Sequence, residues 1–191
     1  MKKLLTLMLC LGAITPMFSQ KTLVDQAAKL SGKPAQLSEA RNQIKQAMSD
    51  PQTKNEARTY FVAGKIEFDA FDNAFKTKMI NPNDASVKPA VMGKELTDGY
   101  NYFVKALPLT DQPDAKGKTD AKTKKNIIGI LKAHANDYFN AGADYFGEKM
   151  FYPEAYETFM IYGNLPEILG DEAASVIDPS QRATAFFNAA L

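Results

Sequence analysis

The only histidine of the chain, His134, is the residue whose type best suits acid–base chemistry, and Asp137 stands three positions after it. A catalytic imidazole needs a carboxylate that orients it and a nucleophile within hydrogen-bond reach. Asp137 could supply the carboxylate, but no serine lies near this pair in the sequence. We therefore expect His134 to be a surface or interface residue rather than a general base.

Five lysines form the most strongly basic segment, and they are Lys116, Lys118, Lys122, Lys124 and Lys125. No aromatic residue alternates with them, whereas proteins that bind single-stranded nucleic acids stack the bases on aromatic side chains. The cluster predicts a solvated loop followed by the start of a helix. Contact with acidic lipid headgroups or polysaccharide is the alternative.

Three aspartates in the same region, Asp111, Asp114 and Asp120, loosely suggest a calcium-binding loop. Their spacing differs from that of such loops, and Lys116 and Lys118 would repel a cation. The sequence also lacks a phosphate-binding glycine loop, a nucleophile elbow and an HExxH motif. We therefore expect no catalytic residue, no metal and no cofactor.

The composition sets the limits within which these side chains must be positioned. The chain has 191 residues, of which 45% are hydrophobic and 24% are charged, as in an ordinary globular domain or one elongated array. A net charge of +1 gives no basic field that would indicate nucleic acid binding. The single cysteine excludes an intramolecular disulfide framework.

Residues 1–19 have the layout of a secretory signal peptide, with Lys2 and Lys3 before an apolar run at 4–14 and the small Ser19 before the expected cleavage point. The run would rise only about 16 Å as a helix, so a membrane span is disfavoured. A buried N-terminal helix is the alternative. The bulky Leu9 disfavours lipid attachment at Cys10. We expect residues 20–191 to be periplasmic or associated with the cell envelope.

Apolar residues recur at steps of three and four along most of residues 20–191, which is typical of amphipathic helices. The clearest run lies between Ile127 and Phe146. Prolines and glycines separate the runs, and the segment Gly163–Pro166 is expected to end a helix. Alternation with period two is nearly absent, so the sequence predicts an all-α fold.

Two parts of the sequence superpose without a gap. The series Val24, Ala27, Ala28, Ala40, Ile44, Ala47, Pro51 has the same intervals as Phe139, Gly142, Ala143, Ala155, Phe159, Tyr162, Pro166. A small side chain on the first helix allows the second helix to approach, and large apolar residues fill the groove beside it. The sequence therefore predicts an internal repeat of helix pairs.

This pattern resembles the tetratricopeptide repeat, a helix–turn–helix unit. The sequence as a whole resembles exported tetratricopeptide proteins of Bacteroidetes-type bacteria. The resemblance implies an α-solenoid with repeats at about 21–52, 57–108 and 120–166, and a partial repeat at 183–191. In the second repeat 35 positions separate Gly64 from Gly99, against 12 between the corresponding residues elsewhere, which indicates an insertion near 73–94. The repeats depart from the family pattern in lacking tryptophan and in placing Glu67 where an aromatic residue is expected.

The last segment is apolar, although the terminal repeat of an array normally presents a polar face. We expect either that the array continues beyond Leu191 or that this end docks on a partner.

The resemblance implies that the first helix of each repeat lines a concave surface that binds partners. The residues expected to bind a partner there are Asp25, Lys29, Arg58, Phe61, Lys65, Phe68, Asp137, Asn140, Asp144, Glu148 and Phe187. We expect a non-catalytic scaffold that binds a peptide or protein, unless the insertion covers Phe61 and Phe68. The alternatives are a glycan-binding protein similar to the SusD-like family, with Tyr100 and Tyr102 as weak sugar platforms, and an enzyme that uses carboxylates alone.

Overall fold

The computed structural model describes residues 19–148 and 151–191, so most of the predicted signal peptide lies outside the described residues. The described part is all-helical and contains no strand. Its α-helices are α1 (Ser19–Leu30), α2 (Leu37–Ser49), α3 (Ala57–Ile80), α4 (Pro89–Thr110), α5 (Ala121–Ala133), α6 (Ala135–Gly147), α7 (Tyr152–Leu169) and α8 (Pro179–Ala189). Short 3₁₀ turns are η1 (Pro34–Gln36), η2 (Ala85–Val87) and η3 (Gly170–Ser175).

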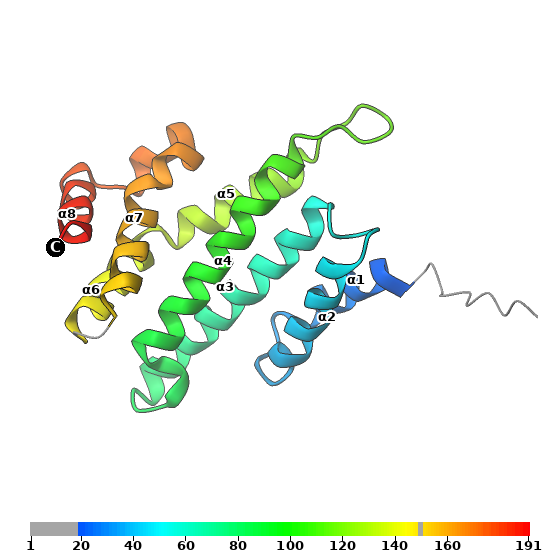
Figure 1. The fold of residues 1–191 in the computed structure, drawn as a ribbon. Coiled ribbons are helices and arrows are strands. Elements are labelled where there is room, and N and C mark those ends of the chain that lie inside the picture. Colours follow the sequence, from blue (N-terminus) through cyan, green and yellow to red (C-terminus); the bar gives the residue numbers. More distant parts are fainter. Residues whose placement is uncertain (1–18, 149–150) are drawn as a thin grey trace, which may run out of the picture.

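Helices that follow one another in the chain pack together, as Figure 1 shows. The main pairs are α1 with α2, α3 with α4, and α6 with α7, and α8 packs on α7. Contacts of α2 with α3 and of α4 with α6 join one pair to the next. The short α5 packs on α3, α4 and α7, so it fills the junction between the second and third pairs.

Small residues allow the paired helices to approach, as the repeat pattern predicts. A Cβ atom on Gly64 of α3 would lie 2.5 Å from ring atoms of Phe103 of α4, and a Cβ on Gly142 of α6 would lie 2.8 Å from the Phe159 ring of α7. A Cβ on Gly163 of α7 would likewise lie 2.5 Å from the Phe186 ring of α8. Because an aromatic ring fills the space that a larger side chain would need, glycine and ring together fix the distance between the helices.

Residues 73–94, where the sequence indicates an insertion, form the end of α3, the turn with η2, and the start of α4. Val87 and Met92 of this segment are buried in the same core as Leu96 and Phe103. The additional residues therefore lengthen the second helix pair at one end, and they supply part of its core.

One expectation about a helix boundary is wrong, and one run of helical spacing spans two helices. The apolar run from Ile127 to Phe146 is divided between α5 and α6, because His134 adopts φ −99° and ψ 11° between them. The same core buries Leu131, Ala135 and Tyr138, although the helix is interrupted at His134. The segment ending at Pro166 does not stop α7, which continues to Leu169. Proline removes only its own N–H donor, the backbone N–H of Gly170 donates to the Pro166 carbonyl, and the Leu169 side chain is buried.

Candidate functional site

The predicted partner-binding residues do not form one continuous surface, because several of them pair within the chain. Arg58 Nη2 donates to Asp25 Oδ1 at 2.5 Å, joining α3 to α1. Lys65 Nζ donates to Asp69 Oδ2 at 2.6 Å along α3. Arg58 and Lys65, which are predicted to bind a partner, are therefore already paired within the chain.

The structure buries Phe68, which the sequence places among the residues that bind a partner. Its side chain is buried, with the Phe103 ring centroid at 5.1 Å and the His134 ring centroid at 4.9 Å. Phe61 is half-buried and stacks on Phe103 at 5.9 Å. The rings of α4 and of the α5–α6 junction occupy the space in which the sequence predicts a partner.

The remaining predicted residues are exposed, apart from the half-buried Asp137, and they lie on three different helices. Lys29 of α1, Glu148 at the end of α6 and Phe187 of α8 are exposed. Three residues of α6, namely Asp137, Asn140 and Asp144, line one hollow together. These three residues therefore gather around one concave site.

We call this hollow the α3–α6 cleft, and its volume is about 310 Å³. It is lined by Phe71, Phe75 and Lys78 of α3, by Pro89, Met92 and Gly93 of α4, and by Asp137, Asn140, Ala141, Ala143 and Asp144 of α6. The C-terminal half of α3 and the N-terminal turn of α4 are thus brought opposite α6. These parts of α3 and α4 belong to the end at which the second helix pair is lengthened.

The walls of the α3–α6 cleft combine an apolar floor with polar rims. Phe71 and Met92 are buried at its base, whereas Phe75 is 49% exposed at its edge. The Phe71 and Phe75 rings lie 6.3 Å apart in a tilted arrangement. An exposed aromatic side chain beside a buried apolar base is typical of the anchor points of binding sites.

Carboxylates dominate the charged rim of the cleft. Asp144 Oδ2 lies 3.8 Å from Lys78 Nζ, which is too long for a hydrogen bond, and both side chains are about half exposed. A second hollow of about 500 Å³ shares Lys78 and Asp144 and extends the site to Glu148. The cleft therefore continues along α6 past its last turn.

His134 contacts two residues that line the cleft, Asp137 and Phe71. Its Nδ1 lies 2.9 Å from Asp137 Oδ2, and its Nε2 lies 3.9 Å from Asp72 Oδ1. Its ring also meets the edge of Phe71, with centroids 5.7 Å apart. The side chain is only 13% exposed, so His134 is an interface residue between α3 and α6, one of the two alternatives that the sequence indicates.

The aromatic residues expected to form sugar platforms are not displayed on the surface. Tyr100 is half-buried and meets Tyr138 edge-on at 6.1 Å. Tyr102 is also half-buried and lies beside the Arg41 and Glu67 side chains in another hollow. A flat exposed ring is what a sugar would need, and neither tyrosine offers one.

The basic segment has the solvated form that the sequence predicts. Residues 111–120 are exposed, and the Asp114 carboxylate accepts from the backbone N–H groups of Lys116 and Lys118. Lys124 donates to Asp111 at 2.8 Å, and Asp120 caps the start of α5. Within the described ranges, no group of three or more His, Cys, Asp and Glu side chains could hold a metal ion.

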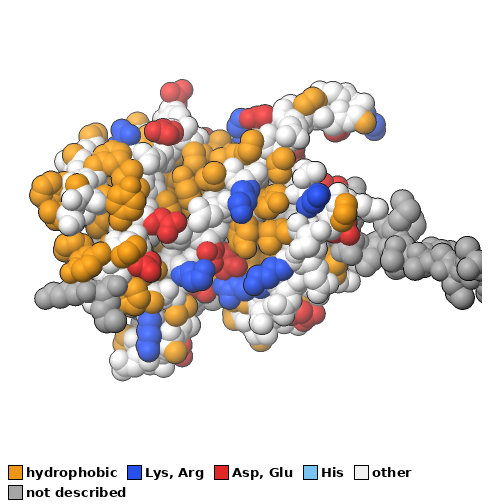
Figure 2. Space-filling model, in the orientation of Figure 1, with side chains coloured by type: hydrophobic (Ala, Val, Ile, Leu, Met, Phe, Trp, Pro, Cys, Tyr) orange, Lys and Arg blue, Asp and Glu red, His pale blue; other side chains and the backbone are white. Residues whose placement is uncertain are grey.

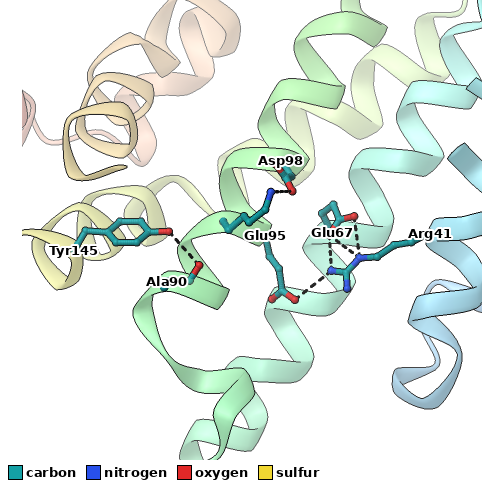
Figure 3. A network of polar contacts seen from close by, with 7 residues as sticks. Arg41, Glu67, Ala90, Glu95, Asp98 and Tyr145 are labelled. Atoms are coloured by element: carbon teal, nitrogen blue, oxygen red, sulfur yellow. Dashed lines mark hydrogen bonds and ion pairs between the residues drawn. The ribbon is translucent and has the colours of Figure 1, made fainter. Parts of the chain in front are cut away.

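Sequence reasoning missed a buried ionic network that joins three helices (Figure 3). Arg41 of α2 donates from Nη2 to Glu67 Oε2 of α3 at 2.5 Å and to Glu95 Oε1 of α4 at 3.2 Å. The two glutamate side chains are only 10% and 13% exposed. Figure 2 shows acidic and basic side chains gathered where α2, α3 and α4 lie side by side. The one sequence signal was Glu67, which replaces an aromatic residue of the repeat pattern.

Burial shifts the ionisation of this network. Loss of water around Glu95 raises the pKa of its carboxyl to about 7, although the Arg41 hydrogen bond opposes the shift. The pKa of Arg41 is raised, chiefly by its hydrogen bond to Glu67. Glu95 Oε2 is buried without a hydrogen-bond partner, which a protonated carboxyl tolerates better than a carboxylate.

The raised pKa predicts that stability falls with pH. Glu95 binds its proton more tightly in the folded chain than in the unfolded chain, so the stabilisation is complete below about pH 4.5 and is lost as pH rises through about 7. In urea unfolding, the contribution of Glu95 should make the free energy of unfolding about 1–2 kcal/mol lower at pH 8 than at pH 5, with solvent screening included. Glu95→Gln should remove that part of the pH dependence. Glu39→Gln, at an exposed position of α2, should retain it; equal slopes for the two variants would contradict the assignment.

Comparisons with models of protein families, with curated proteins and with solved structures found no match to this chain. In the described part, no helix combines the length and apolar character needed to cross a membrane.

Proposed function

We propose that this chain is an exported, non-catalytic scaffold of tetratricopeptide-like helix pairs that binds a peptide or protein partner. The observation that carries the proposal is the α3–α6 cleft, in which the half-exposed Phe75 stands over a buried apolar floor and faces the predicted α6 residues. Apolar anchors surrounded by polar groups are typical of surfaces that bind protein segments.

The packing order supports the repeat interpretation. Each helix packs on its predecessor within a pair, and glycine faces an aromatic ring in the α3–α4, α6–α7 and α7–α8 contacts. Repetition of one contact along an array produces an extended surface, as in solenoid proteins. Export to the periplasm or cell envelope is proposed from the layout of residues 1–19.

The arrangement of carboxylates favours binding rather than catalysis. Arg41 forms ion pairs with both Glu67 and Glu95, and Asp137 is hydrogen-bonded to His134. Hydrolysis by carboxylates alone needs an acid and a base that face one substrate bond at a set separation. The rim of the α3–α6 cleft instead places Lys78, Asp137 and Asp144 next to apolar surface, which suits recognition of a side chain.

Photo-crosslinking tests the proposal. A benzoylphenylalanine placed at Phe75 in the full chain, expressed in cells that export it, should give a discrete adduct. The same probe at Lys45, exposed on α2, should give none. Ala143→Trp, at an exposed position that lines both hollows, should fill the cleft and abolish the Phe75 adduct. No adduct at Phe75, or an adduct that survives Ala143→Trp, would overturn the assignment of the cleft.

A further inference from the structure

The α3–α6 cleft and its extension carry an excess of negative charge. The acidic residues that line the two hollows are Asp84, Asp137, Asp144 and Glu148, and the basic residues are Lys78 and Lys88. Hydrogen bonds from Ser86 lower the pKa of Asp84, so this carboxyl is charged at neutral pH. Asp72, half exposed beside His134, adds a further acid next to the lining residue Phe71 in the sequence.

Asp144 is the carboxylate that is least engaged within the cleft itself. Its nearest cation, Lys78, is 3.8 Å away, and an exposed ion pair of this kind contributes little to stability. A guanidinium could bind the same carboxylate with two parallel hydrogen bonds and would displace Lys78 at small cost. Asn140, one turn before Asp144 on α6, offers an amide to the same space.

The apolar side of the cleft suits the stem of a long basic side chain. Phe75 presents a half-exposed ring at the rim, and arginine stacks favourably on aromatic faces. Buried Phe71 and Met92 line the base, against which a neighbouring apolar side chain could pack. The volume of about 310 Å³ lies at the small end of ligand pockets, so it suits one or two side chains.

We propose that the α3–α6 cleft binds a partner segment through an arginine or lysine next to an apolar residue, with the cation on Asp144 and the apolar group against Phe75 and Met92. This inference rests on the proposed scaffold function and specifies the chemistry of its partner. Lys78 acts in the free protein as a weak internal substitute for the partner's cation.

Two dipeptides test the charge preference directly. Acetyl-Phe-Arg-amide and acetyl-Phe-Glu-amide are titrated into the ¹⁵N-labelled full chain, and backbone amide shifts of Asn140 and Asp144 are followed. The arginine dipeptide should saturate at about a tenfold lower concentration, since one charge-assisted hydrogen bond has roughly this effect. The difference should shrink in high salt, because the site is open to solvent. Equal saturation by the two dipeptides would overturn the proposal.

Two variants make the test specific to Asp144. Asp144→Asn should abolish the preference for the arginine dipeptide, whereas Asp171→Asn, an exposed carboxylate on η3, should preserve it. Lys78→Ala should tighten binding of the arginine dipeptide by about twofold or more, because the internal competitor is removed. Weaker binding after Lys78→Ala would overturn the proposed role of Asp144.

The dipeptide and crosslinking results separate this inference from the proposed function. A Phe75 adduct without an arginine preference would retain the scaffold and refute the basic partner. An arginine preference confined to the cleft without any adduct would support the cation site and refute the scaffold. If neither the adduct nor the arginine preference were observed, both the scaffold function and the basic partner would be refuted.

Discussion

Gly64→Ala should lower the free energy of unfolding by about 1–3 kcal/mol, even though alanine is the better helix former. The added Cβ would lie 2.5 Å from two ring atoms of Phe103 and 3.0 Å from the backbone oxygen of Gly99. Phe103 is fully buried and is held between the Phe61 and Phe68 rings, so it cannot turn away. The long α3 and α4 helices must therefore separate, and urea unfolding at constant pH measures the loss.

Gly129→Ala is the matched control for this substitution. Gly129 lies inside α5, and nothing comes within 4 Å of the Cβ that alanine would add. Here only the helix propensity changes, so the free energy of unfolding should rise by about 0.5–1 kcal/mol. If both variants were stabilised, the close approach at Gly64 would not be a determinant of the fold.

The contact at Gly64 belongs to the part of the fold that could be predicted from the sequence. A closely packed helix pair can be recognised in the sequence, because small and large residues must occur at fixed intervals for the two helices to approach. The spacings around Gly142 and Phe159 predicted a closely packed helix pair for this reason, and the all-α class followed from the same periodicity.

The break between α5 and α6 could not be predicted in this way. Leu131, Ala135 and Tyr138 keep helical spacing across His134, and all three are buried. The spacing indicates which residues face the core. One continuous helix and two consecutive helices can both produce it, so the spacing does not distinguish between them. The break places the His134 ring on Phe68, which removes Phe68 from the predicted binding surface.

The candidate site was predicted only where one helix supplies several residues. Asp137, Asn140 and Asp144 lie on one face of α6, so their helical spacing brings them together. The opposite wall comes from Phe75 and Lys78, whose position depends on how far α3 extends beyond its repeat. Tertiary packing decides that geometry, and no short-range pattern in the sequence records it.

The Arg41 network was missed because its members lie far apart in the chain. Glu67 and Glu95 stand 26 and 54 positions after Arg41, on separate helices. A charged residue on a helix is ordinarily solvated, so each of the three reads as a surface residue on its own. Only the packing of α2 against α3 and of α3 against α4 buries the two carboxylates around one cation.

Arg41→Met should therefore destabilise the chain by about 2–4 kcal/mol at pH 8. Methionine retains the apolar stem but leaves two mostly buried carboxylates without their cation, and breaking a buried ion pair from one side is costly. A third of the Arg41 side chain is exposed, which keeps the loss below that of a fully enclosed pair. At pH 5 the loss should be smaller, because Glu95 can take up a proton.

Arg58→Met provides the matched control, since it removes the same charge from the exposed pair with Asp25. Both side chains of that pair are at least half exposed, so the loss should stay below about 1 kcal/mol. Adding Glu67→Gln to Arg41→Met should recover part of the stability at pH 8, because the amide needs no counter-charge. Similar losses for the two arginine variants, with no recovery in the double variant, would mean that water already solvates Glu67 and Glu95. The network would then have no part in holding the first helix pair against the second.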